Sequence, residues 1–184
     1  MASSPNPAVL FQSIFAGLTQ RGEKLNGDTR VGQWGAKLAA VLLDPNRSAA
    51  PPWENFSVPG AAPSASPWGV KPRGSTDGDK DALFFDSISN GEQLTGVLRS
   101  APFNLPEKLT FWMCGHNGHP GTNPPPVNHA RLVLVDSGEV IRKEVPPRND
   151  IAREYTWDTK PWAGQKAVFE AVDADTGTAY AWLA

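Results

Sequence analysis

The pattern of hydrophobic and polar residues predicts short strands over most of the second half of the chain. From residue 82 onward, apolar or alternating stretches are separated by polar loops rich in Gly and Pro. Each stretch has the length and the β-branched or aromatic content of a strand. The predicted strands are Ala82–Ile88, Thr95–Ser100, Leu109–Gly115, Ala130–Val135, Glu139–Val145, Glu154–Asp158, Lys166–Asp173 and Thr178–Ala184. Such spacing over about a hundred residues predicts an all-β sandwich, in which the loops carry function.

Two of these stretches predict how strands pair. Arg131–Val135 and Glu139–Arg142 flank Asp136-Ser137-Gly138, which predicts a hairpin with Gly138 in a left-handed conformation. Leu109–Gly115 is apolar on both alternating faces, which predicts a central strand with a partner on each side. The connections are too short to hold crossover helices, so the pairing should be antiparallel.

The first fifty residues have helical periodicity instead. Leu10, Ile14 and Leu18 recur every four residues and predict one amphipathic helix. A second helix is predicted over Thr29–Leu43, with Pro45 ending it. Two helices of this length cannot bury their apolar stripes alone, so they need a packing partner.

The chain is therefore divided into three parts. Residues 1–50 are interpreted as a helical segment, the tail of a preceding domain. Residues 51–67 are rich in Ala, Pro and Ser, which predicts a linker or strap, although Trp53 and Phe56 allow a first edge strand. Residues 68–184 form the predicted β-sandwich domain.

The composition limits the classes of partner that the chain is expected to bind. The chain has 184 residues, 40% of them hydrophobic, which is enough for a core. Its formal net charge of −2, with charges interspersed, argues against nucleic-acid binding, which needs a basic face. We find no stretch long enough to span a membrane and no secretory signal at the N-terminus.

The single cysteine, Cys114, excludes an internal disulfide. Its place in an apolar stretch predicts a small buried hydrophobic residue, with a reactive thiol as the alternative. No Gly-x-Ser-x-Gly element is present, so nucleophilic catalysis is not expected.

Three histidines are candidates for metal binding. His116 and His119 have His-x-x-His spacing, and His129 follows a Pro-rich loop, so zinc ligation is one alternative. The stiffening Pro120 and the lack of an adjacent acidic residue favour a solvated or recognition loop instead. We predict no metal-ligating residues and no cofactor.

Pairs of carboxylates offer one further alternative. Asp173 and Asp175 occupy a predicted turn, where Asp is favoured for backbone reasons. A structural calcium site is the alternative there, and Asp77, Asp79 and Asp81 could equally supply oxygen ligands. Acid–base catalysis is not expected, and the chain is predicted not to be an enzyme.

Aromatic and polar residues near the loops predict sugar binding. An aromatic ring stacks on the C–H face of a sugar, while Arg, Asn, Asp and His bond its hydroxyl groups. Trp157 and Trp162 are expected to lie close to Arg148, Asn149 and Asp150, and the 115–119 loop is expected to share that rim. Trp162, flanked by Pro161 and Ala163-Gly164, is the best candidate for an exposed ring, whereas Trp182 is interpreted as core. Pairing of Arg148 with Asp150 to hold its own loop is the alternative role for that arginine. The predicted ligand-binding residues are His116, Asn117, Arg148, Asn149, Asp150, Trp157 and Trp162.

Five segments occur in an order that resembles a known family. They are Asn90–Gly96, Arg99–Phe103, Phe111–His116, Pro147–Asp150 followed by Thr156–Asp158, and Val172–Trp182. The order resembles the galactose-binding-like jelly roll at the tail of large planctomycete-type cell-surface proteins with c-type cytochrome domains. It is more distantly similar to the β-sandwich appended to some fructan-degrading glycoside hydrolases. The haem-attachment motif Cys-x-x-Cys-His of the cytochrome part is absent from this chain.

The resemblance covers the chain from about Pro67 onward and implies an antiparallel jelly-roll β-sandwich with a binding or organising role. It implies a part of a larger cell-envelope or secreted protein, in the periplasm or outside the cell. The expected function is non-catalytic carbohydrate binding, with a glycan as partner. A docking domain that contacts neighbouring domains of the same polypeptide is the alternative.

Overall fold

A computed structural model describes residues 32–33, 35–36, 53–62 and 64–184. The chain divides into two compact units, Met1–Ala50 and Pro51–Ala184, and each is described by itself. In the first unit, the four described residues 32, 33, 35 and 36 are helical. The first predicted helix and the rest of the second lie outside the described residues and stay predictions. No helix among the described residues is long and apolar enough to span a membrane.

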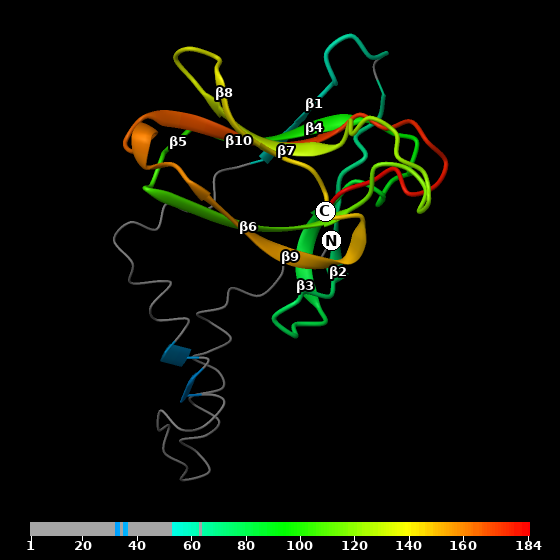
Figure 1. The fold of residues 1–184 in the computed structure, drawn as a ribbon, viewed down its shortest axis with the longest axis horizontal. Helices are drawn as coiled ribbons and strands as arrows, with labels where there is room; N and C mark the ends of the chain where they lie inside the picture. The colour runs from blue at the N-terminus through cyan, green and yellow to red at the C-terminus, as the bar shows by residue number, and fades with distance from the viewer. Residues whose placement is uncertain (1–31, 34, 37–52, 63) are drawn as a thin grey trace. The chain divides into compact units, whose positions relative to one another are not determined.

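The second unit is built on a six-stranded antiparallel sheet (Figure 1). Its strands are β1 (Trp53–Phe56), β4 (Gly96–Ser100), β5 (Phe103–Asn104), β7 (His129–Leu134), β8 (Val140–Glu144) and β10 (Lys166–Asp173). The order is β1-β4-β10-β7-β8, and the short β5 also pairs with β10. The segment interpreted as a linker therefore contributes the edge strand β1, which was the alternative interpretation.

A second layer packs against this sheet. It consists of β6 (Lys108–Gly115) and β9 (Asn149–Asp158), which pair antiparallel with each other. Phe111 and Met113 of β6 join Leu132 of β7 and Phe169 of β10 in the main apolar core between the layers. The prediction of a mainly β fold is confirmed for the described residues. The specific jelly-roll topology stays a prediction, because β6 and β9 form a separate two-stranded sheet.

A hairpin of β2 (Gly69–Arg73) and β3 (Ala82–Asp86) covers the other face of β6 at one end. There Phe84 and Trp112 pack against a second, smaller apolar cluster that contains the buried Cys114. Residues just after β2 reach the edge of β9, where the Ala152 amide donates to the Gly74 carbonyl at 2.8 Å.

The C-terminal residues lie along the opposite edge of β6. The amides of Cys114 and Ala184 donate to each other's carbonyls at 2.9 and 3.1 Å, and the Ser87 amide donates to Leu183 at 3.1 Å. At this end β6 therefore has a hydrogen-bonded partner on each side, whereas further back it pairs with β9 alone. One apolar face of β6 packs against the main sheet, and the other packs against the hairpin.

Most predicted strands are present with shifted ends, but one is wrong. Thr178–Ala184 is not a strand, because the left-handed Tyr180 (φ 59°) interrupts the extended backbone and leaves an isolated bridge at Leu183. The predicted hairpin is confirmed: β7 pairs with β8, and Gly138 has φ 69°. The sequence pattern missed β2, β5 and the first half of β9. β2 contains Pro72, which argues against a strand except at an edge.

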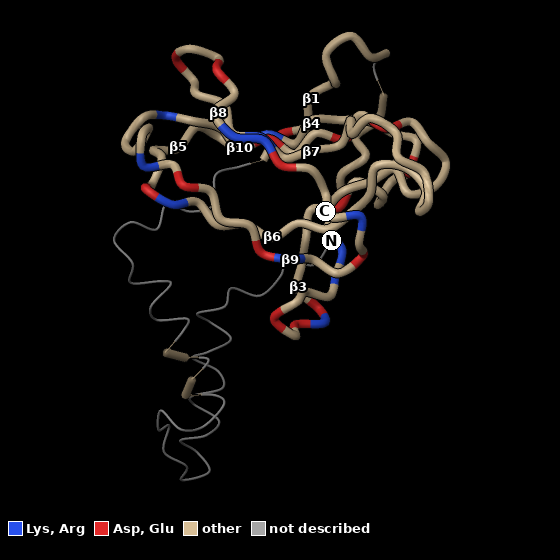
Figure 2. Tube along the Cα trace, in the orientation of Figure 1, with Lys and Arg blue, Asp and Glu red and all other residues tan. Residues whose placement is uncertain are grey.

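A row of charged side chains crosses the main sheet. In register, Glu54 of β1 lies opposite Arg99, Arg99 opposite Glu170, Glu170 opposite Arg131, and Arg131 opposite Lys143. Glu170 is only 1% exposed, and its carboxylate oxygens accept from Arg99 Nε at 2.6 Å and from Arg131 Nε at 2.5 Å. Elsewhere along the described chain, basic and acidic positions are interspersed (Figure 2).

Candidate functional site

Most of the predicted binding residues converge at one end of the second unit. The pairing of Gly115 with Asn149 brings the loop after β6 beside the loop before β9. The C-terminal residues join them, since the His116 amide donates to the Trp182 carbonyl and the Gly118 amide to Tyr180, both at 2.8 Å. We call these three segments, residues 116–128, 145–150 and 174–182, the rim.

A buried imidazole and an exposed carboxylate pair at the rim. His116 Nε2 lies 3.0 Å from Asp150 Oδ1. The His116 side chain is 6% exposed, whereas that of Asp150 is 69% exposed. A carboxylate only accepts, so we assign the bonding proton to Nε2. The Asp150 carboxylate is thereby fixed in position while most of its surface remains open to a ligand.

Tyr180 lies against two imidazoles. Its ring meets those of His116 and His119 edge-on, at centroid distances of 5.0 and 4.9 Å. The backbone of Tyr180 is left-handed, with φ 59°, which is uncommon for a bulky side chain and costs free energy. The surrounding contacts stabilise this conformation, and such strain is concentrated at functional sites.

Arg148 shares that backbone conformation but has a different role. Its φ is also 59°, and together these two are the non-glycine residues with positive φ in the described chain. The guanidinium donates to the carbonyls of Gly118 at 3.2 Å and His119 at 2.8 Å. Arg148 therefore holds the loop after β6 in place, and we interpret it as a positioning residue. Its expected pairing with Asp150 is not observed.

Two asparagines fasten the rim segments to one another. Asn117 Oδ1 accepts from the amides of Val127 and Asn128 at 2.9 and 2.7 Å. The fully buried Asn128 in turn donates to the His116 carbonyl at 3.2 Å and accepts from the Ala174 amide at 2.9 Å. Asn117 is itself buried, so its side chain supports the rim from below. Sequence reasoning missed Asn128, which has no distinctive motif around it.

Asn149 has a local role as well. Its Oδ1 accepts from the Ile151 amide at 2.8 Å, a bond that sets the start of β9. The side chain is exposed, so the amide nitrogen can still reach a ligand.

The rim borders a cleft of about 300 Å³ (the rim cleft). The residues that line it are Arg73, Ile88, Glu92, Asp150, Ala179, Tyr180 and Trp182. The Arg73 guanidinium lies 4.0 Å from the centre of the Trp182 ring and is bonded to the buried Asp86, with Nε 2.7 Å from Oδ2. Glu92 accepts from the Ala181 amide at 3.0 Å. The rim cleft thus combines aromatic surface with one guanidinium and two carboxylates.

Sequence reasoning did not identify most of this lining. Arg73 lies on β2, a strand that the pattern missed, and Glu92 lies in the loop after β3, far away in sequence. Tyr180 was assigned to a regular strand, and nothing in its flanking residues indicates a left-handed backbone. Trp182 was interpreted as core, and it is only 4% exposed.

The two predicted tryptophans lie elsewhere. Strand β9 separates Asn149, at the rim, from Asp158 at its other end, which pairs with Lys108. Trp157 is buried in the main core, with its ring 4.6 Å from that of Phe111. The expectation that these tryptophans lie close to residues 148–150 is wrong, because an extended strand spaces residues by about 3.3 Å each.

Trp162 follows the same strand at its far end. It lies in the short 3₁₀ helix Lys160–Trp162, half-buried against the main core, and Arg142 stacks 4.6 Å from its ring centre. It was the best candidate for an exposed sugar platform. The structure places it outside the rim.

The candidate metal ligands do not gather in one place. His116 and His119 both contact Tyr180, whereas His129 lies in β7, opposite Val172 of β10. Among the described residues, no three His, Cys, Asp or Glu side chains lie close enough together to hold a metal ion. The zinc and calcium alternatives therefore gain no geometric support within that part of the chain.

Two buried titratable groups lie near the rim. Burial raises the pKa of the Cys114 thiol to about 12, so the thiol stays protonated and is a buried hydrophobic residue as predicted. Burial also raises the pKa of Asp173, to about 7, despite hydrogen bonds from Ser87 and the Asp175 amide. Asp173 Oδ2 has no hydrogen-bond partner among the described residues, which is consistent with a carboxyl group that favours its protonated form.

Comparisons with known proteins give limited information. No protein-family model matches the chain. Over 89 residues, 48% of this chain, it is 27% identical to a protein of Aspergillus rugulosus described as "Putative glycosyl hydrolase ecdE". The matched part covers 12% of that protein, so its activity as a whole cannot be transferred.

One solved structure also resembles the chain. It is the C-terminal extracellular domain of Mycobacterium tuberculosis EmbC, with 15% identity, coverage of 82% of this chain and 68% of that one, and a TM-score of 0.39. A likeness this weak carries no argument about function. Neither protein is a planctomycete-type cytochrome protein, so that resemblance has no support from them.

Proposed function

We propose that the second unit is a non-catalytic carbohydrate-binding module that holds a glycan in the rim cleft. The carrying observation is that the half-buried Tyr180 ring and the exposed Asp150 carboxylate line one cleft of about 300 Å³. Sugars are bound by an aromatic face for their C–H surface together with fixed polar groups for their hydroxyls. The rim cleft contains both kinds of group.

The polar groups are already in position without a ligand. Asp150 is held by His116, Arg73 by Asp86, and Glu92 by the Ala181 amide. Side chains fixed in this way lose little conformational freedom on binding, which favours affinity for a hydroxyl-rich ligand. Asp150 and Glu92 would accept hydrogen bonds from sugar hydroxyls, and Arg73 would donate to a sugar oxygen.

The matched fungal protein supports a carbohydrate-related role. Its description names a glycosyl hydrolase, and the match covers about half of this chain. We infer that the unit, with a galactose-binding-like jelly-roll topology, belongs to a larger protein that works in the periplasm or outside the cell. There it would keep that protein at its glycan.

A glycan array tests the proposal directly. The purified chain should bind a defined group of glycans, and Tyr180→Ala and Asp150→Ala should each weaken binding at least tenfold with nearly unchanged melting temperature. Trp162→Ala is the matched control, because it removes an aromatic ring outside the rim and should leave affinity unchanged. A blank array, or equal loss in all three variants, would contradict the rim cleft as the site.

Two further arms test the other parts of the proposal. Binding should survive chelation by EDTA, because no metal-holding cluster occurs among the described residues. Incubation of bound oligosaccharides with the protein should release no new reducing ends. Release that depends on Glu92 or Asp150 would show an enzyme instead.

A specific observation favours docking to a neighbouring domain as the second candidate. Val70, Leu83 and Phe85 lie on one face of the β2–β3 hairpin and are 59%, 74% and 41% exposed. Adjacent exposed apolar side chains of this size often mark a contact surface. In that case Leu83→Lys should abolish association with neighbouring domains of the same polypeptide, measured by sedimentation, and leave glycan binding unchanged.

A further inference from the structure

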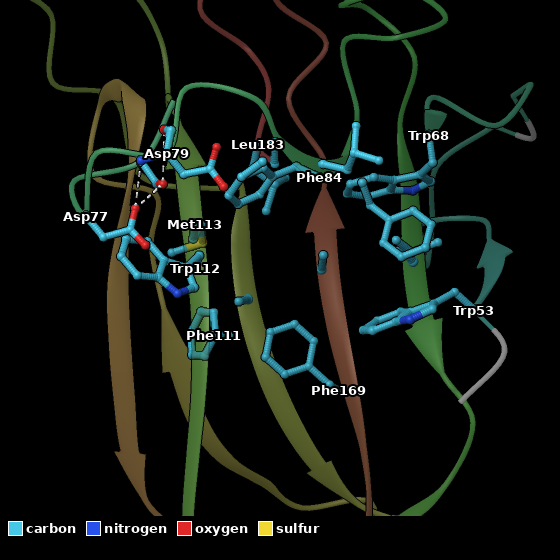
Figure 3. Close-up of a pocket in the computed structure, with 18 residues that line it drawn as sticks. Trp53, Trp68, Asp77, Asp79, Phe84, Phe111, Trp112, Met113, Phe169 and Leu183 are labelled. Atoms are coloured by element: carbon cyan, nitrogen blue, oxygen red, sulfur yellow. Dashed lines mark hydrogen bonds between the residues drawn. The ribbon is translucent and has the colours of Figure 1, made fainter. Parts of the chain in front are cut away.

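A second and larger pocket lies between the main sheet, β6 and the β2–β3 hairpin, apart from the rim cleft. Its volume is about 380 Å³, and Figure 3 shows the side chains around it. On the main sheet, Ala171 of β10 pairs with Ala130 of β7 on one side and with Leu98 of β4 on the other. The two small alanine side chains leave the space between the layers open.

The walls of this pocket are apolar and rich in aromatic rings. Seven of its lining residues have aromatic rings: Trp53, Trp68, Phe84, Phe85, Phe111, Trp112 and Phe169. They come from four separate strands and the segment before β2, so the rings surround the space from several directions. The volume of this open pocket lies within the range of ligand pockets.

The charged residues that line the pocket are all acidic. Asp77 and Asp79 lie at one end of the pocket, in the loop between β2 and β3 (Figure 3). No basic residue lines the pocket in the described chain, although the exposed Lys80 lies in the same loop.

The two carboxylates are held in position. Asp77 Oδ1 accepts from the Ser75 hydroxyl at 2.5 Å and from the Asp79 amide at 3.2 Å. The bond from Ser75 is the main cause of a pKa of Asp77 below its ordinary value, so this carboxylate remains negatively charged. Asp79 accepts through Oδ1 from the Asp81 amide at 2.9 Å. Each side chain uses one oxygen in the loop and keeps the other for a ligand.

We propose that this pocket binds a small organic cation, in which an ammonium or quaternary ammonium group is attached to an apolar or aromatic body. Aromatic rings attract a cation through the negative potential of their faces, and the apolar body replaces water in the pocket. Asp77 and Asp79 add attraction for the cationic group and disfavour anions. The pocket differs from the rim cleft in its residues and its chemistry, so the proposal is independent of glycan binding.

Binding of three probes of similar size tests the charge preference. The full chain is titrated at low ionic strength with benzyltrimethylammonium, neutral benzyl alcohol and anionic phenylacetate, and tryptophan fluorescence and the indole N–H signals in NMR are followed. The cation should bind most tightly and phenylacetate most weakly. Equal affinity for all three probes, or no binding of the cation, would overturn the proposal.

Variants locate the binding. Asp77→Asn combined with Asp79→Asn keeps the loop acceptors and removes two exposed charges, so the Kd for the cation should rise about three- to tenfold. Affinity for benzyl alcohol should not change. Asp81→Asn is the matched control, because it removes a charge from the same loop without lining the pocket. An unchanged Kd in the double variant would refute the role of the carboxylates.

Filling the pocket provides a second test. Ala171→Leu should reduce binding of all three probes, while the melting temperature of the variant shows whether the protein still folds. If Ala171→Leu fails to fold, the smaller Ala171→Val serves instead. Undiminished cation binding by a folded variant would place the cation elsewhere and overturn the proposal.

Discussion

The two ends of the β6–β9 pair both contain an arginine stacked on a tryptophan, yet they differ in their surroundings. At the rim, Arg73 lies 4.0 Å from the ring centre of Trp182 and is also bonded to the buried Asp86. At the far end, where Lys108 pairs with Asp158, Arg142 lies 4.6 Å from the ring centre of Trp162. Its guanidinium donates to backbone carbonyls, one of them that of Ile141 at 2.8 Å.

An arginine–tryptophan stack occurs at both ends, so by itself it does not identify a binding site. At the far end the stack covers the core, and the guanidinium is used within the fold. At the rim, the exposed Asp150 and the strained Tyr180 lie beside the stack, so fixed polar groups and aromatic surface are available together. Function is expected where these features converge.

The largest expected difference concerns stability. Asp86→Ala removes the buried partner of Arg73 and should lower the free energy of unfolding by about 3–5 kcal/mol, because a charge is left partly buried and unpaired. Arg142→Ala at the far end removes a more exposed group, whose hydrogen bonds contribute about 1 kcal/mol each. Urea denaturation of both variants measures the contrast. Equal losses would show that the two stacks are equivalent.

The stability of the fold should also respond to pH, through the buried Asp173 beside the rim. The pKa of Asp173 is about 7 in the folded protein, compared with an ordinary value of 3.8. The folded state therefore binds more protons between these values, and stability should fall as pH rises from about 4 to 7. We expect this contribution to change by about 2–4 kcal/mol across that window, since one pKa unit corresponds to about 1.4 kcal/mol.

Asp173→Asn mimics the protonated side chain and tests this directly. Its free energy of unfolding should vary less between pH 5 and pH 8 than that of the parent protein, and should exceed it at pH 8. Asp136→Asn provides the control, because that side chain is exposed and is not among the groups that act on Asp173. Parallel pH profiles for the parent and Asp173→Asn would exclude Asp173 as the cause.

A double comparison separates folding from binding. Trp162→Ala should lower the free energy of unfolding by about 2 kcal/mol, somewhat less than a fully buried Trp, because it removes a half-buried ring that packs on the core. Tyr180→Ala should cost less stability, since its ring contacts the two imidazoles at the rim and is not part of the main apolar core. Melting curves and glycan affinities are measured for both variants. If Trp162→Ala lost affinity and Tyr180→Ala lost only stability, the glycan site would belong to the far end and not to the rim.

The smallest effect concerns turns. Gly138 allows the β7–β8 turn its left-handed conformation without a side chain, and no atom lies within 4 Å of an added Cβ. Gly138→Ala should therefore cost only about 1 kcal/mol, through backbone conformation alone, and Gly138→Asn less. A larger loss by thermal denaturation would indicate an unseen contact at this turn.

The sequence predicted the strands better than the site. Alternation in Lys166–Asp173 and the Gly138 turn reflect local preferences, and both predictions are confirmed. The rim cleft depends on residues far apart in sequence, such as Arg73, Glu92 and Tyr180. They come together through the contact of the residues after β2 with β9 and the pairing of the C-terminal residues with β6. Trp157 was misplaced because sequence proximity to Asn149 ignored the length of the strand between them.

The two apolar faces of Leu109–Gly115 indicate which layers cover the strand, and do not indicate which strands pair with it. Both faces of Leu109–Gly115 are covered, as the pattern requires, but by separate layers above and below β6. The pattern reports what covers the faces of a strand, and hydrogen-bonded neighbours at its edges are a different property. The predicted partner on each side of the strand is therefore found only at the end of β6, where the C-terminal residues pair with it.

The buried Glu170 has a consequence for how the sheet assembles. Side chains alternate between faces, so a slip of β10 by one residue would turn Glu170 toward the apolar interior and Phe169 outward. Arg99 and Arg131 would then lie on the opposite face of the sheet and could not neutralise the carboxylate. An unpaired buried charge is strongly unfavourable. Glu170 thus disfavours incorrect strand registers during folding. The flanking alanines and valines alone would tolerate such registers.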